Sequence, residues 1–241
     1  MYKNKSILGI IPARGGSKGL PRKNIKLLLN KPLIAWTIEE AKKSKYLDRI
    51  IISTDDEEIA KISESFGAEV PFMRPQQLAQ DSTPSYEVIK HCIEYFHQKM
   101  NVSYDYIALL EPTSPLRETS DIDNSIELLI NNKSATSIVS IAQLDKIDLN
   151  YIFSVKEQFL ISPFENNPNF SVKHKTRQEM EKLYFPDGTI YISETYEYLN
   201  KKTFYHEKTL AYIVDKYKSY EIDDILDFII IETLLKHKKD Y

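Results

Sequence analysis

Short apolar runs alternate with amphipathic stretches along the first half of the chain. The runs at 7–12, 49–53, 106–110 and 135–141 are rich in β-branched residues and leucine, which is typical of strands covered on both faces. The stretches at 33–44, 57–66, 84–99 and 121–131 are predicted to be helices. This order of elements predicts an α/β fold with a doubly wound, mainly parallel sheet.

Residues at the expected helix ends support this division. Pro32 suits the first turn of the helix at 33–44. Asp55 or Asp56 is expected to cap the helix at 57–66, and Gly67 to end it. Ser120 is the predicted cap of the helix at 121–131.

The pattern breaks from about residue 144 to 185, where aromatic and turn-forming residues replace it. A flexible lid is one interpretation, but so many aromatic side chains are unusual in a solvated loop. We interpret 144–185 as an insertion that packs against a second subunit, giving a C₂ homodimer, and that helps to complete the active site. The core is expected to resume at 188–193 and 210–214 and to end in a helix over about 223–238, within a single domain at 1–241.

Composition excludes several classes of protein. The chain has 42% hydrophobic and 28% charged residues, as soluble globular proteins do. No apolar run is long enough to span a bilayer and no signal peptide is recognisable, so we expect a cytoplasmic protein without membrane attachment. The single cysteine, Cys92, excludes a disulfide framework, and we expect it to be a buried packing residue rather than a nucleophile.

Positive charge is concentrated near the N-terminus. Residues 1–38 hold eight Lys and Arg and no acid, and because the whole chain has a net charge of −3, residues 39–241 carry −11. This distribution indicates a site for a compact polyanion rather than a surface for nucleic acid or membrane. The segment 12–24, Pro-Ala-Arg-Gly-Gly-Ser-Lys-Gly-Leu-Pro-Arg-Lys-Asn, could cradle phosphate with backbone N–H groups and cations, although it matches neither the dinucleotide fingerprint nor the P-loop. A solvated basic turn is the alternative.

Other polar segments follow the predicted strands or lie near the C-terminus. The segment 111–117, stiffened by two prolines, follows the strand at 106–110, and ligands of open α/β sheets bind at such carboxyl ends. Glu221 and Asp223 flank one apolar residue, so in an extended segment both carboxylates face one side and suit Mg²⁺ together with phosphate oxygens. The alternatives are a purely structural loop at 111–117, a helix cap at Asp223, and another cap at Asp81 or Ser82.

Three of these segments together carry a family resemblance. The residues at 11–24, at 53–60 (Ser-Thr-Asp-Asp-Glu-Glu-Ile-Ala) and at 112–117 (Pro-Thr-Ser-Pro-Leu-Arg) resemble the acylneuraminate cytidylyltransferases, or CMP-sialic acid synthetases. Relatives in that family activate legionaminic and pseudaminic acids. The resemblance extends over nearly the whole chain, including 187–192 and 219–227, and the loop differs from the Ser-Thr-Arg-Leu-Pro-Gly-Lys of the Kdo cytidylyltransferases.

The resemblance implies roles for particular residues, with Mg²⁺ as the cofactor. Matched positions are the triphosphate contacts Arg14, Ser17, Lys18 and Lys23, the nucleotide contact Asn24, the cytosine contacts Arg74 and Ser85, the sugar-pocket residues Arg177, Tyr191, Phe204 and Tyr205, and the metal ligands Glu221 and Asp223. Arg14, Lys18 and Lys23 would act in catalysis by offsetting charge on departing pyrophosphate.

Three positions depart from the family pattern. Glu111 stands where the family usually has Gln, Asp187 where it has Asn, and Glu221 where it has Asp. Glu111 would touch both nucleotide and sugar, and Asp187 the sugar. Two additional acids predict an acceptor with extra hydrogen-bond donors or a cationic substituent.

The implied activity is transfer of CMP from CTP to the anomeric hydroxyl of a nine-carbon 2-keto sugar acid, with release of pyrophosphate. The acceptor would be N-acetylneuraminic acid or a legionaminic-type acid used in cell-surface polysaccharides. One alternative is a nucleotidyltransferase for a Kdo-like acid, a sugar phosphate or a phosphonate. The other, a catalytically silent nucleotide-binding protein, is disfavoured because the loop lysines and both carboxylates are present.

Overall fold

The computed structural model describes residues 1–144, 152–155, 161–163 and 182–237. The predicted insertion at 144–185 therefore lies mostly outside the described residues, and its role in dimerisation stays a prediction. Within it the described part contains one antiparallel pair, β7 (Phe153–Val155) with β8 (Ile161–Pro163).

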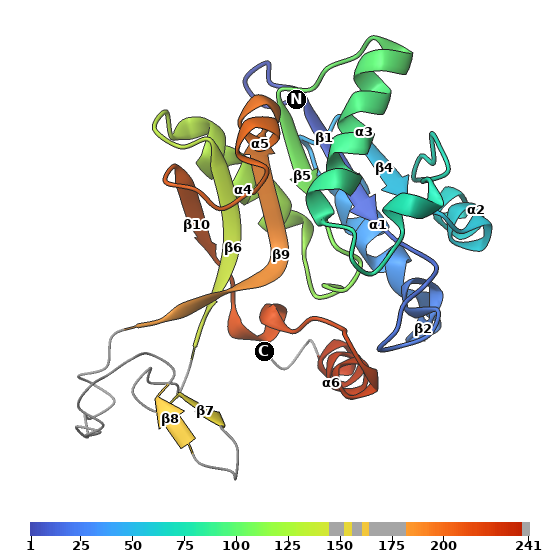
Figure 1. The fold of residues 1–241 in the computed structure, drawn as a ribbon, viewed down its shortest axis with the longest axis vertical. Coiled ribbons are helices and arrows are strands. Elements are labelled where there is room, and N and C mark those ends of the chain that lie inside the picture. Colours follow the sequence, from blue (N-terminus) through green and yellow to red (C-terminus); the bar gives the residue numbers. More distant parts are fainter. Residues whose placement is uncertain (145–151, 156–160, 164–181, 238–241) are drawn as a thin grey trace.

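A six-stranded sheet forms the centre of the molecule, in the order β10-β6-β9-β5-β1-β4 (Figure 1). Its strands are β1 (Ile7–Pro12), β4 (Arg49–Ser53), β5 (Tyr106–Leu109), β6 (Ser137–Gln143), β9 (Tyr184–Glu194) and β10 (Thr209–Ile213). The pairs β1–β4, β1–β5 and β10–β6 are parallel, whereas β9 runs antiparallel to both β5 and β6. The predicted mainly parallel sheet is confirmed, with one reversed strand inserted between its two parallel parts.

Helices cover both faces of this sheet. One hydrophobic cluster joins the sheet to α1 (Leu33–Lys43), α2 (Glu57–Ser65) and α4 (Thr119–Asn131). A second cluster joins the opposite face to α3 (Ser85–Met100) and α5 (Thr195–Lys201), and the fully buried Cys92 of α3 belongs to it. Burial raises the pKa of the Cys92 thiol to about 12, which agrees with its expected role in packing.

The remaining elements are short or lie at the edge of the sheet. They are η1 (Lys23–Ile25), β2 (Leu27–Leu28), β3 (Lys31–Pro32), η2 (Gln76–Leu78), η6 (Lys216–Ser219) and α6 (Ile225–Lys236). A third cluster packs Phe228 and Ile231 of α6 against Leu20, Leu28 and Ile222. This packing brings the C-terminal segment beside the loop that follows β1.

Capping explains where three helices begin, and it corrects two expectations. Asp56 caps α2 by accepting hydrogen bonds from the backbone of Glu58 and Ile59, as predicted. The cap of α4 is Glu118, in a capping box with Asp121, so the prediction of Ser120 was wrong. Asp224 caps α6, which excludes Asp223 as its cap.

The alternative role of Asp81 or Ser82 as a helix cap is also wrong. The N-cap of α3 is Pro84, and no side chain caps that helix.

Among the described residues, no helix is long and apolar enough to cross a membrane.

Candidate active site

The loop after β1 is held in shape by hydrogen bonds from both sides. The N–H group of Gly15 donates to Asp55 Oδ1 (3.0 Å), at the carboxyl end of β4. The buried Asn24 donates from Nδ2 to the carbonyl oxygen of Arg14 (3.0 Å). The loop is therefore fixed by its own neighbours, which reduces the entropy that a ligand must remove when it binds.

Eight residues predicted for the site line one cavity of about 630 Å³, at the edge of the sheet where β1 and β5 end. They are Arg14, Ser17, Lys18, Lys23, Asn24, Glu111, Glu221 and Asp223. The structure therefore brings the basic loop, the segment after β5 and the two C-terminal acids together, although they are far apart in sequence. Gly19 and Asp81 also line this cavity, and they were not predicted as site residues.

Each basic side chain in the cavity contacts a carboxylate. Arg14 Nη2 lies 2.8 Å from Asp81 Oδ1, and Lys18 Nζ lies 2.5 Å from Asp81 Oδ2. The Lys18 ammonium group lowers the pKa of Asp81, with a smaller effect from Arg14. Lys23 lies 3.2 Å from Asp223 Oδ1. A bound polyanion would compete with these carboxylates for the same cations.

A smaller pocket of about 250 Å³ adjoins the cavity and contains both residues predicted to contact cytosine, Arg74 and Ser85. Arg74 is 6% exposed, and its guanidinium group donates to the carbonyl oxygens of Ser53 and Leu78. Among the described residues it forms no ion pair, and burial lowers its pKa. The N–H groups of Arg74 that do not donate to these two carbonyls are thus available for neutral acceptors such as carbonyl oxygens and ring nitrogens.

Carboxylates crowd the other part of the large cavity. Ser114 Oγ donates to Glu221 Oε1 (3.2 Å). Burial, followed by the nearby Glu111, raises the pKa of Glu221 to about 7, and burial also raises the pKa of Glu111. Asp223 is exposed, with 84% of its side-chain surface accessible. This group of acids favours a cation.

Three described residues predicted for the sugar pocket lie together, outside the lining of the two pockets above. The rings of Tyr191 and Phe204 are 5.4 Å apart, and those of Tyr191 and Tyr205 are 6.2 Å apart, but none of these three residues lines either pocket above. Phe204 is 6% exposed because it packs on Tyr198 in the core, so it offers little surface to a ligand. Arg177 lies outside the described residues.

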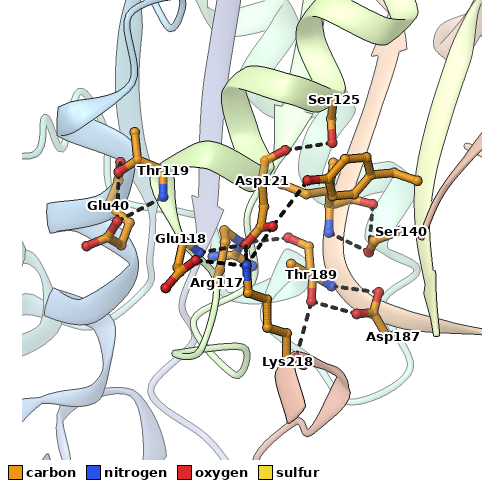
Figure 2. Close-up of polar contacts among 12 residues, drawn as sticks. Glu40, Arg117, Glu118, Thr119, Asp121, Ser125, Ser140, Asp187, Thr189 and Lys218 are labelled. Carbon is orange, nitrogen blue, oxygen red and sulfur yellow. Dashed lines mark hydrogen bonds and ion pairs between the residues drawn. The ribbon is translucent and has the colours of Figure 1, made fainter. Parts of the chain in front are cut away.

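Asp187, another residue predicted for the sugar pocket, is buried. Its side chain is 1% exposed, and Thr189 Oγ1 donates to its Oδ2 (2.7 Å), as Figure 2 shows. This carboxylate is therefore hydrogen-bonded inside the protein, and contact of Asp187 with the acceptor stays a prediction. Glu111 is the one of the two departures from the family's amides that borders the cavity.

Arg117 supports the cavity from behind. It is 2% exposed and donates to the carbonyl oxygens of Thr189 (2.6 Å) and Glu111 (2.9 Å) and to Thr37 Oγ1 (3.1 Å). Burial lowers its pKa to about 10, although Glu111 opposes this effect. The sequence showed Arg117 only as the last residue of the segment 111–117, and nothing in the sequence alone showed which backbone groups it would hold.

Comparisons with known proteins identify the family of this chain. A family model described as cytidylyltransferase matches residues 8–239. N-acylneuraminate cytidylyltransferase of Escherichia coli O18:K1:H7 is 36% identical over 238 residues, which are 96% of this chain and 52% of that protein. This chain therefore spans about half the length of the E. coli relative.

Two relatives of similar length align with this chain over almost their whole length. CMP-N,N'-diacetyllegionaminic acid synthase of Legionella pneumophila is 34% identical, and pseudaminic acid cytidylyltransferase of Campylobacter jejuni is 32% identical, each over 95% of this chain and 96% of the relative. A solved CMP:2-keto-3-deoxy-manno-octonic acid synthetase in complex with CTP shares the fold, with a TM-score of 0.69 at 15% identity over 97% of this chain and 99% of that one. The chain belongs to the cytidylyltransferase family.

Proposed function

We propose that this protein transfers CMP from CTP to the anomeric hydroxyl of a nine-carbon 2-keto sugar acid and releases pyrophosphate. The observation that carries the proposal is the continuity of the site. We call the smaller pocket the base pocket and the large cavity the phosphate cavity. The two share Pro12, Arg14 and Asp81, and the phosphate cavity also contains Glu221 and Asp223. The sialic, legionaminic and pseudaminic acids in the relatives' names supply the acceptor class.

The smaller pocket suits cytosine. Cytosine presents a carbonyl oxygen and a ring nitrogen, both hydrogen-bond acceptors, on one edge. Arg74 is buried there without a carboxylate partner among the described residues, so its guanidinium group can donate to that edge without first breaking an ion pair. Ser85, the first residue of α3, also lines this pocket.

The loop cations would handle the phosphates. The acceptor's hydroxyl would attack the α-phosphorus in line, and the bond to pyrophosphate would break on the opposite side. Arg14, Lys18 and Lys23 would offset the charge that develops on the departing pyrophosphate. Lys23 is prepared for this role because its side chain is only 14% exposed and donates to the carbonyl oxygen of Ile222 (2.7 Å).

Glu221 and Asp223 would hold a divalent cation, which we propose to be Mg²⁺. Burial and the nearby Glu111 raise the pKa of Glu221, and a cation bound there would favour its ionised form. Among the described residues there is no cluster of three or more side chains able to bind a metal, so phosphate oxygens and water would complete the coordination, as Mg²⁺ prefers. When bound, the ion would stabilise negative charge on the α-phosphate.

Glu111 is the best-placed candidate for acceptor selectivity. It borders the phosphate cavity, whereas Asp187 does not. A carboxylate there favours an acceptor that presents a hydrogen-bond donor or a positive charge, and it opposes an additional anion. We also propose that the protein works as a homodimer through 144–185, which light scattering at micromolar concentration can check.

The decisive experiment measures pyrophosphate release with each of the four nucleoside triphosphates and a panel of acceptors. The panel would contain N-acetylneuraminic, legionaminic, pseudaminic and eight-carbon 3-deoxy-octulosonic acids and a sugar phosphate. We expect release with CTP and at least one nine-carbon acid, and none from an Asp223→Asn variant. Faster turnover of the eight-carbon acid or of the sugar phosphate would refute the acceptor class, and preference for another nucleotide would refute the role given to Arg74.

A further inference from the structure

A buried ion pair lies behind the cavity, between α4 and the segment that leads to the two C-terminal acids. Lys218, in η6, is 5% exposed, and Asp121, in the first turn of α4, is 3% exposed. Lys218 Nζ lies 2.9 Å from each carboxylate oxygen of Asp121 and 2.9 Å from Glu118 Oε2, as Figure 2 shows. Tyr212 also donates its hydroxyl proton to Asp121 Oδ1 (3.2 Å). Neither member of the pair lines the base pocket or the phosphate cavity.

Stability alone is a poor reason for this pair. Moving an ammonium group and a carboxylate out of water costs several kcal/mol for each, and apolar residues of similar size often stabilise a fold as well or better. A pair with several well-made hydrogen bonds does, however, specify one arrangement of the two segments that it joins. Lys218 can satisfy its three donors in this way only when η6 sits at one position along the first turn of α4.

One of those segments carries the proposed metal ligands. Lys218 precedes Glu221 by three residues, and its carbonyl oxygen lies 3.4 Å from Thr189 Oγ1, whose proton is donated to Asp187. Further along, the N–H group of Ile222 donates to the carbonyl oxygen of Thr113 (2.9 Å). Because contacts at Lys218 and Ile222 hold both ends of this short segment, the position of Lys218 constrains the position of Glu221.

The other segment carries the rest of the acidic cluster. Asp121 lies four residues after Arg117, and Arg117 donates to the carbonyl oxygen of Glu111 (2.9 Å). Asp121 also accepts from the N–H group of Glu118 (2.8 Å), which locks the start of α4 to the end of the 111–117 loop. The ion pair therefore joins the two chain segments whose carboxylates meet in the cavity.

We infer that Lys218 and Asp121 are positioning residues, whose ion pair sets the place of Glu221 and Asp223 relative to the 111–117 loop. The inference rests on the proposed function, because it takes these two acids as the ligands of a divalent cation. It assigns neither residue a contact with substrate. Loss of a side chain that hydrogen-bonds directly to a metal ligand lowers metal affinity by about 10- to 100-fold in other metal sites, and we expect the lower part of that range here because the ion pair acts through the backbone.

Calorimetry of CTP binding without an acceptor tests the inference apart from turnover. The dissociation constant of CTP would be measured with Mg²⁺ and with a chelator, and the ratio of the two values is the metal gain. The variants are Lys218→Met and the double variant Lys218→Met with Asp121→Asn, which removes both charges of the buried pair. Glu118 also loses its contact with Lys218 in these variants, but 33% of its side-chain surface is exposed to water. Lys5→Met is the matched control, because it breaks the Lys5–Asp105 pair (2.9 Å), which lies before β1 and β5 begin, at the far end of these strands from the cavity.

We expect the folded double variant to bind CTP without metal within about twofold of the wild type, because the base pocket and the loop are unchanged. Its metal gain should be at least about tenfold smaller than that of the wild type. Lys5→Met should keep the full gain. A double variant with the wild-type gain would overturn the inference and leave the proposed function standing. A wild type that binds CTP equally well with and without Mg²⁺ would overturn the metal assignment and the inference with it.

Discussion

Gly19 is the position where one methyl group best tests the geometry of the site. It lines the phosphate cavity, and a Cβ added there would lie under 3.0 Å from the carbonyl oxygen of Asp223, whereas ordinary contact begins at 3.4 Å. Gly19→Ala must therefore separate the loop from residues 221–223, which carry the two proposed metal ligands, by at least about 0.4 Å. Side-chain rotation cannot relieve the clash, because one atom is a Cβ and the other belongs to the backbone.

The expected loss appears in both the rate and the stability. A misplacement of 1 Å can cost about 100-fold in rate, so a shift of several tenths of an ångström or more predicts a kcat/KM about 10- to 100-fold lower. Gly19 has no positive φ, but the added Cβ would meet backbone rather than the end of a flexible side chain, so the free energy of unfolding should also fall, by about 0.5–3 kcal/mol.

Initial rates of pyrophosphate release and thermal melting would measure both quantities. Gly16→Ala is the matched control, because it changes another glycine of the same loop where an added Cβ meets nothing within 4 Å. It should therefore keep most of the wild-type kcat/KM. Equal kcat/KM values for the two variants would refute the reasoning, since the close approach of residues 19 and 223 would then have no effect on the reaction.

Four further variants test single groups in the site or beside it. Lys23→Ala should lower turnover by about two to three orders of magnitude, because it removes a cation that the carbonyl oxygen of Ile222 holds in place; a wild-type rate would contradict its role at the phosphates. Asp223→Ala should abolish metal-dependent turnover without lowering Tm. Asp224→Ala should keep turnover but remove the cap of α6, which lowers the free energy of unfolding by about 1 kcal/mol and Tm by about 2–4 °C. The opposite pattern would exchange the two assignments. Asp81→Asn frees the two loop cations that Asp81 bridges, so pyrophosphate should inhibit about 2- to 5-fold more strongly, and unchanged inhibition would show that the bridge does not compete with phosphate.

The hydrophobic pattern predicted the elements of the sheet but not all of their directions. The core was expected to resume at 188–193, and this run forms most of β9 (Tyr184–Glu194). Its antiparallel direction depends on the path of the chain between β6 and β9, and strand direction leaves no mark on a short run of apolar residues. Helix caps were predicted less well, because several adjacent polar residues could cap α4 and α6 and only the geometry selects among them.

The site was predictable where loops follow strands and less so where contacts are distant in sequence. The basic loop after β1 and the segment after β5 had to meet, because the carboxyl ends of parallel strands share one edge of the sheet. The pair of Lys218 with Asp121 spans 97 residues and leaves no local signal. The burial of Phe204 and Asp187 was missed for a similar reason, since whether a side chain faces a cavity or the core depends on its neighbours across the sheet.

The central position of β9 has a consequence for the order of folding. β6 and β10 join the other three strands only through β9, and the pairing of Leu109 with Tyr191 must close a long loop. Contacts between distant residues form late because closing a long loop costs entropy. The parallel unit of β4, β1 and β5, which carries the basic loop, should therefore form before β9 enters and before Glu221 and Asp223 reach the loop. Pulsed hydrogen exchange during refolding should show amides of β1 and β5 protected earlier than those of β6 and β10, and simultaneous protection would mean that the whole sheet forms in a single step.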